Sequence, residues 1–160
     1  MLMMMMRSKF DSAVKGTDVI RRFKRVIQNC TGGGTLLTRY HLINNRFFGI
    51  YLHHLQSSDE DRACHDHPWS FISILLTGGY GEWTPHHRYD RENRTIRRQE
   101  KMIWYPRWSV LRRPAEWQYR LQLDKPVWTL VFRGPERRVW GFLPSGTWMH
   151  HVAYGKTFCD

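Results

Sequence analysis

The feature that most constrains the fold is a succession of short strand-like runs that begins after Gly34. These runs are rich in β-branched and aromatic residues, and Asn, Asp, Gly and Pro separate them. They cover residues 35–43, 46–55, 70–76, 80–87, 101–105, 109–113, 118–123, 127–133 and 137–143. Many short strands at regular spacing predict an antiparallel sandwich or barrel of the jelly-roll kind.

One segment before these runs has a helical pattern. In GTDVIRRFKRVIQN, residues 16–29, Thr17 or Asp18 can cap the N-terminus, and apolar residues recur at helical spacing. The glycines of TGGG, residues 31–34, would end this helix. We therefore expect a flexible tail over residues 1–14 and a single domain over residues 15–160, all-β with one N-terminal helix.

The charge of the chain indicates its partners more than its fold. Lys and Arg total 25 against 14 Asp and Glu, which gives a formal net charge of +11. This balance favours an anionic partner, although the basic residues could equally keep a tryptophan-rich surface soluble. The three cysteines show no CxxC spacing and argue against a disulfide framework. With no segment long and uncharged enough to span a bilayer, we expect a cytoplasmic protein without membrane contact.

The clearest local motif is His65-Asp66-His67, directly before Pro68 and an apolar run. In an extended chain, residues i and i+2 point to the same side of the strand. The two imidazoles should therefore face one space, while Asp66 points away. Two neutral imidazoles at a rigid strand end can begin a site for a divalent metal, but such a pair is also common as a structural or surface feature.

The motif and its surroundings resemble the small bacterial and phage-borne cupins that carry an HDHPW signature. The resemblance rests on HDHPWSFISILLTGGYGEW at 65–83, RRPAEWQYRLQL at 112–123 and PVWTLVFRGPERRVWGF at 126–142, and it spans roughly residues 36–146. It implies a cupin double-stranded β-helix, that is, a jelly-roll barrel. Because cupins commonly pair through edge strands, the resemblance also implies a homodimer.

The resemblance further implies a metal site in the barrel mouth. Many cupins hold a divalent metal through two histidines of an HxH pair, an acid a few residues on, and a histidine from a second motif. His65 and His67 match the pair. At the spacing where the family has the acid, this chain has Phe71 and Ile72, and at the position of the second-motif histidine it has Tyr119. The implied ligands are thus His65, His67 and Tyr119, for Fe, Mn, Ni or Zn. Tyrosine, with a pKa near ~10, is a poorer ligand than imidazole at neutral pH.

Other residues are candidates for catalysis and for ligand binding. Glu82 and Tyr119 are the acid/base candidates if the barrel catalyses a reaction. Arginine suits planar contact with carboxylate or phosphate, and tryptophan offers a stacking face. The candidate ligand-binding residues are Trp69, Arg112, Trp117, Arg120 and Arg133. The alternative is that the tryptophans form the core and the arginines cover the outer strands.

Three functions follow from these observations. The first is a cupin-fold protein that binds a small anionic ligand, nucleotide-like or a carboxylate, in the barrel mouth, with or without a divalent metal. The second is a metal-dependent cupin enzyme of dioxygenase or isomerase type. The third is a phage-type nucleotide-signal sponge without catalysis, which is analogy alone. Polymeric nucleic acid is less favoured, because the chain has no helix-turn-helix, zinc-finger, RRM or KH signature.

Overall fold

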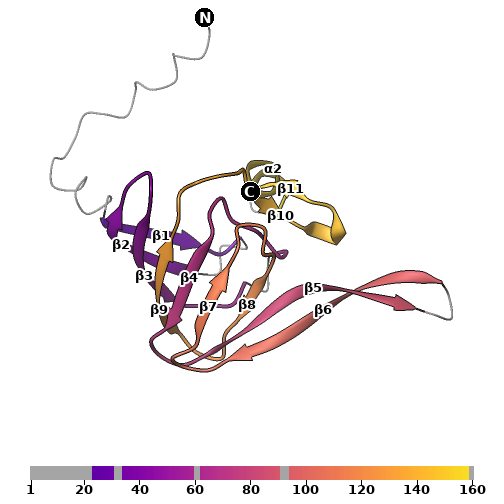
Figure 1. The fold of residues 1–160 in the computed structure, drawn as a ribbon, viewed down its shortest axis with the longest axis horizontal. Coiled ribbons are helices and arrows are strands. Elements are labelled where there is room, and N and C mark those ends of the chain that lie inside the picture. Colours follow the sequence, from indigo (N-terminus) through magenta and orange to yellow (C-terminus); the bar gives the residue numbers. More distant parts are fainter. Residues whose placement is uncertain (1–22, 31–33, 60–61, 91–93, 159–160) are drawn as a thin grey trace, which may run out of the picture.

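A computed structural model describes residues 23–30, 34–59, 62–90 and 94–158. Most of these residues lie in antiparallel strands (Figure 1). A six-stranded sheet has the strand order β1-β2-β3-β9-β4-β7. Its strands are β1 (Lys24–Gln28), β2 (Thr35–Asn44), β3 (Gly49–Leu55), β9 (Val127–Arg133), β4 (Phe71–Leu75) and β7 (Val110–Arg113).

Two smaller sheets complete the described structure. One has the order β6-β5-β8 and contains β5 (Tyr80–Asp90), β6 (Thr95–Tyr105) and β8 (Arg120–Gln122). The other pairs β10 (Gly141–Phe142) with β11 (Met149–His150), separated by the 3-10 turn η1 (Pro144–Gly146). The helix α2 (His151–Phe158) follows β11 directly. In Figure 1 the β5–β6 hairpin extends well beyond the other strands, and the C-terminal elements β10, β11 and α2 lie together.

The expected N-terminal helix is wrong over residues 24–28. Residues 24–28 form the edge strand β1, in which Val26 pairs with Thr38 and Ile27 with Leu37 of β2. Pairing with β2 therefore overrides the helical spacing of the apolar residues, since only Ile27 is partly buried. Residues 16–22 of the expected helix, and the expected tail over residues 1–14, lie outside the described residues. The helix that the described structure contains is C-terminal, and the sequence pattern did not indicate it.

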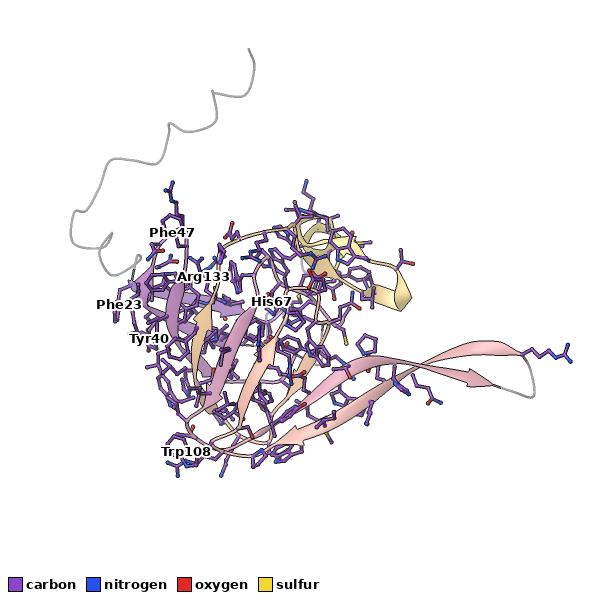
Figure 2. All side chains as sticks on the ribbon, in the orientation of Figure 1. Phe23, Tyr40, Phe47, His67, Trp108 and Arg133 are labelled. Carbon is purple, nitrogen blue, oxygen red and sulfur yellow. The ribbon has the colours of Figure 1, made fainter. Side chains whose placement is uncertain are left out.

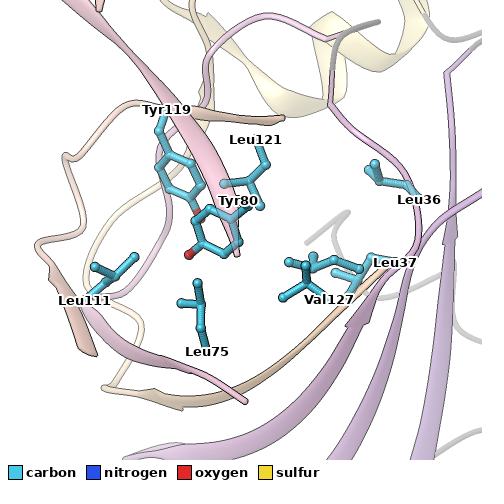
Figure 3. Packing of buried hydrophobic residues seen from close by; sticks show 9 residues of the cluster. Leu36, Leu37, Leu75, Tyr80, Leu111, Tyr119, Leu121 and Val127 are labelled. Atoms are coloured by element: carbon cyan, nitrogen blue, oxygen red, sulfur yellow. The ribbon is translucent and has the colours of Figure 1, made fainter. Parts of the chain in front are cut away.

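The strand predictions after Gly34 are largely confirmed, because alternation and turn residues agree. In β9 every second residue is buried, from Val127 to Arg133, so one face of this strand is turned away from solvent. The β2–β3 turn is held by Asn45, whose Oδ1 accepts backbone hydrogen bonds from Phe47 and Phe48 at 2.9 and 3.0 Å. Buried residues of the six-stranded sheet and of the β6-β5-β8 sheet meet in one core, shown in Figure 3. The core comprises Leu36, Leu37, Leu55, Leu75, Tyr80, Leu111, Tyr119, Leu121 and Val127.

Two further expectations concern cysteine and the membrane. Cys64 is buried, and Cys30 is disulfide-bonded, a bond that the argument against a disulfide framework did not anticipate. Within the described residues, none of the helices combines the length and the apolar character that a membrane span requires.

Candidate functional site

A cavity of about 620 Å³ lies against the six-stranded sheet, within the range typical of small-molecule sites. Strands of the six-stranded sheet form one wall, and the segment around the HDH motif and the C-terminal elements form another. The lining residues include both motif histidines and a mixture of charged and apolar side chains: Arg25, Ile27, Leu36, Leu37, Arg39, His53, Leu55, Asp59, Arg62, His65, His67, Pro68, Trp69, Phe71, Ser73, Tyr80, Tyr119, Leu121, Thr129, Val131, Glu136, Arg138, Val139, Trp140, Phe142 and His151.

His65 and His67 both line this cavity, as strand alternation predicts. His65 forms isolated bridges with Tyr119 and Phe142, and the His67 amide donates to the carbonyl of Ala115 at 3.0 Å. These bonds hold the motif in an extended conformation, and the two imidazole ring centroids are 5.2 Å apart. Figure 2 places His67 in the interior, while Phe47 and Trp108 lie at the periphery at opposite ends.

Asp66 points away from the cavity and holds the C-terminal elements in place. Its side chain is 1% exposed. Oδ2 accepts hydrogen bonds from Arg138 Nη1 at 2.8 Å and Trp148 Nε1 at 3.0 Å, and Oδ1 accepts one from the Gly141 amide at 2.7 Å. Because Arg138 lines the cavity and Gly141 begins β10, this carboxylate ties the motif to the C-terminal wall of the cavity.

His67 is paired with Tyr119, and both groups are neutral. His67 Nε2 and the Tyr119 hydroxyl are 2.9 Å apart. Burial raises the pKa of the Tyr119 phenol well above its usual value, and burial, reinforced by the nearby His65 and Arg39, lowers the pKa of His67 well below the ordinary value. The phenol thus keeps its proton at neutral pH, and the imidazole stays uncharged.

His65 is neutral as well, and one of its ring nitrogens is unsatisfied. Burial lowers the pKa of His65, an effect that the nearby Asp59 carboxylate opposes. Nδ1 lies 4.0 Å from Asp59 Oδ2, too far for a hydrogen bond, and it is buried with no partner in the described part of the chain. A buried ring nitrogen without a partner is costly in the empty cavity and is available to a ligand.

The donor set around these histidines fits a resident divalent metal poorly. The described residues contain no group of three or more His, Cys, Asp or Glu side chains placed to hold a metal ion. The Tyr119 phenol, which would be the third ligand, is protonated and hydrogen-bonded to His67. Near the position where the resemblance implies an acid, the Phe71 ring instead packs against His67 with centroids 5.1 Å apart. Two imidazoles alone make a weak metal site.

Arg39 contributes a positive charge to the cavity wall, and it was not among the residues predicted from the sequence. Arg39 lies on β2, directly opposite His53 of β3, and Arg39 Nε donates to His53 Nε2 at 3.0 Å. Its guanidinium carbon is 5.1 Å from the centroid of the Tyr51 ring. No carboxylate among the described residues forms an ion pair with Arg39. Burial lowers the pKa of Arg39 and, together with the charge of Arg39, lowers that of His53.

The sequence-predicted acid Glu82 does not line the cavity. Glu82 is 2% exposed, and its two carboxylate oxygens accept hydrogen bonds from Arg113 at 3.0 and 3.2 Å. Glu82 Oε1 also accepts from Trp117 Nε1 at 2.6 Å. The predicted ligand-binding residue Trp117 is therefore hydrogen-bonded to Glu82, and it is not among the residues that line the cavity.

The predicted arginines are likewise outside the cavity lining, whereas Trp69 belongs to it. Arg112 is exposed on β7, and Arg120 pairs with Glu100 at 2.8 Å. Arg133 is buried against the β2–β3 hairpin: its Nε donates to the Tyr51 hydroxyl at 2.9 Å, and Nη2 donates to the Asn45 carbonyl at 2.7 Å. The structure thus brings His65, His67, Tyr119 and Trp69 to the cavity wall, whereas Arg112, Arg120 and Arg133 are not among its lining residues. Arg133 nevertheless contacts Trp69, with its guanidinium carbon 5.3 Å from the centroid of the Trp69 ring.

Comparisons with known proteins support the fold. No protein-family model matches the sequence, and no curated protein matches it either. A structure of Fe(II)-HppE with the alternative substrate (S)-1-HPP matches with a TM-score of 0.50 and 8% identity over 69% of this chain and 55% of that chain. A structure of FeII HppE matches with a TM-score of 0.50 and 9% identity over 78% of this chain and 62% of that chain. The chain thus spans little more than half the length of these proteins.

A cupin superfamily protein from Desulfitobacterium hafniense also matches, with 12% identity, a TM-score of 0.45 and coverage of 62% of this chain and 78% of that chain. At such low identity these similarities concern the fold alone. The two HppE matches, at a TM-score of 0.50, support a fold like that of those proteins for this chain.

Proposed function

We propose that the protein binds a small organic anion inside its barrel. The observation that carries this proposal is the Arg39 guanidinium, which lines the cavity without an ion-pair partner among the described carboxylates. A buried charge that lacks a counter-charge is costly, and an anionic ligand removes that cost when it enters the cavity. Guanidinium also offers a fork of N–H donors that matches carboxylate and phosphate oxygens.

The remaining lining supports a small-molecule ligand. Neutral groups surround Arg39, because His53, His67 and Tyr119 stay uncharged at neutral pH, and these can exchange hydrogen bonds with ligand oxygens. Aliphatic and aromatic side chains cover much of the rest of the wall. Trp69 offers an aromatic face, so a nucleotide-like ligand is one candidate within this class.

Thermal-shift and calorimetric titration with a panel of nucleotides, organic phosphates and carboxylates test this proposal. At a hundredfold excess over Kd, a ligand stabilises the folded state by about 2.7 kcal/mol, which corresponds to a rise in Tm of about 5–11 °C for a chain of this size. We expect such a shift with at least one anion and its loss in Arg39→Gln. Arg46→Gln removes an exposed arginine at the β2–β3 turn and is the matched control.

Two results would overturn the proposal. One is the absence of any shift with every anion in the panel. The other is an anion-induced shift that Arg39→Gln and Arg46→Gln leave equally intact, which would place binding elsewhere on a basic protein.

A further inference from the structure

A row of four residues crosses the inner face of the large sheet. Arg25 of β1 is directly opposite Arg39 of β2, Arg39 is opposite His53 of β3, and His53 is opposite Thr129 of β9. Directly opposite residues in antiparallel strands share one face of the sheet. All four residues line the cavity, so the row forms a continuous polar strip on its wall.

Two like charges stand side by side in this strip. Opposed like charges on neighbouring strands are destabilising, and no described carboxylate forms an ion pair with Arg25 or Arg39. Within the described structure, the only hydrogen bond donated by either guanidinium is that from Arg39 Nε to His53. The two terminal amino groups of Arg39 and all the donors of Arg25 are therefore available to a ligand.

The neighbouring row is entirely apolar. Two residues further along the same face, Ile27 pairs with Leu37, Leu37 with Leu55, and Leu55 with Val127. The first three of these residues line the cavity, and Val127 belongs to the core beside them. A ligand whose charged end lies on the arginine row would thus place its carbon portion against an aliphatic surface.

We propose that Arg25 and Arg39 together hold the phosphoryl group of a phosphate monoester whose organic portion is apolar or aromatic. This inference rests on the proposed anion-binding function and names the ligand class. A phosphate monoester carries close to two negative charges at neutral pH and three terminal oxygens, so it matches two adjacent guanidinium groups in charge and in donor number. A monocarboxylate carries one charge and two oxygens, which Arg39 alone satisfies.

Titration calorimetry with phenyl phosphate and benzoate tests the assignment, because both probes have the same apolar ring. We expect wild type to bind phenyl phosphate at least tenfold more tightly than benzoate. Arg25→Gln should weaken phenyl phosphate binding about tenfold or more, as expected for loss of one charge-assisted contact, and should change benzoate binding less than threefold. Arg39→Gln should weaken both, and Arg46→Gln should weaken neither.

A second readout separates this role from a structural one. Without ligand, Arg25→Gln removes one of two opposed like charges, so its Tm should equal or exceed that of wild type. Equal affinity of wild type for the two probes, with no effect of Arg25→Gln on either, would refute the phosphoryl assignment and leave anion binding at Arg39 standing. If neither these probes nor any other anion binds, both proposals fall. Should Arg39→Gln fail to fold, Arg25→Gln, which replaces an exposed residue, still decides the question.

Discussion

Replacement of Asp66 by Asn tests whether the middle residue of the HDH motif holds the C-terminal wall. The substitution keeps the side-chain size but removes the charge. The amide nitrogen of the new asparagine is a donor, and it would face one of the N–H groups that now donate to the carboxylate. Asp66 accepts three hydrogen bonds, one of them from the charged Arg138. Breaking a buried ion pair typically costs about 3–5 kcal/mol, and the side chain of Arg138 is 29% exposed, so water compensates part of the loss. We therefore expect the lower end, about 3 kcal/mol.

Urea denaturation followed by circular dichroism measures this loss, and a thermal melt should show a decrease in Tm of about 6–12 °C. Asp124→Asn, at an exposed carboxylate between β8 and β9, is the control and should change stability by less than about 0.5 kcal/mol. A destabilisation below about 1 kcal/mol in Asp66→Asn would refute the reasoning, because it would show that the three donors find other partners without this charge.

Three further predictions concern the cavity and its surroundings. Tyr119→His should create a cluster of three imidazoles with the HDH pair and should bind Co²⁺, detected by its visible absorption, at least tenfold more tightly than wild type; equal affinity would contradict the proximity of these groups. Glu82→Gln should destabilise the fold by about 3–5 kcal/mol, because Arg113 loses a buried partner, and leave anion affinity unchanged in calorimetry. Since the pKa of His53 is lowered in the folded state, protonation of this residue in the unfolded chain below about pH 6.5 contributes up to about 1.4 kcal/mol per pH unit to the loss of stability, in addition to the contributions of His65 and His67, whose pKa values are lowered as well. His53→Gln should flatten the pH dependence of unfolding in that range relative to wild type and to His86→Gln, and an equally steep profile would contradict this.

Period-two alternation predicted the parts of the site that lie on one strand. It placed His65 and His67 on a common face and Asp66 on the other, and the structure has all three there. It could also have found Arg39, because Leu37 and Arg39 are two residues apart and the apolar Leu37 marks the inner face. An arginine at an inward position of an apolar strand was the signal that the sequence interpretation did not use.

Contacts between distant segments could not be predicted in this way. Glu82 and Arg113 belong to different sheets and are 31 residues apart, so only the folded chain shows that they neutralise each other. Similarly, the predicted ligand-binding residue Arg133 donates its hydrogen bonds to Tyr51 and Asn45 of the β2–β3 hairpin, which precede it by more than 80 residues. The error over residues 24–28 has the same origin, since the apolar spacing of the segment suits a helix in isolation and pairing with β2 makes residues 24–28 a strand.

Charge decides what this cavity can hold. The residues at the position of the implied metal site are neutral, and the polar row beside them carries two unpaired positive charges. Asp59 and Glu136 also line the cavity, yet they are outnumbered by Arg25, Arg39 and Arg62 even before Arg138, which Asp66 neutralises, is counted. A divalent cation would add its charge to this surplus, whereas a dianion offsets it. The same wall that makes a metal unfavourable therefore makes a phosphate favourable, and anion affinity should fall steeply when either arginine of the row is removed.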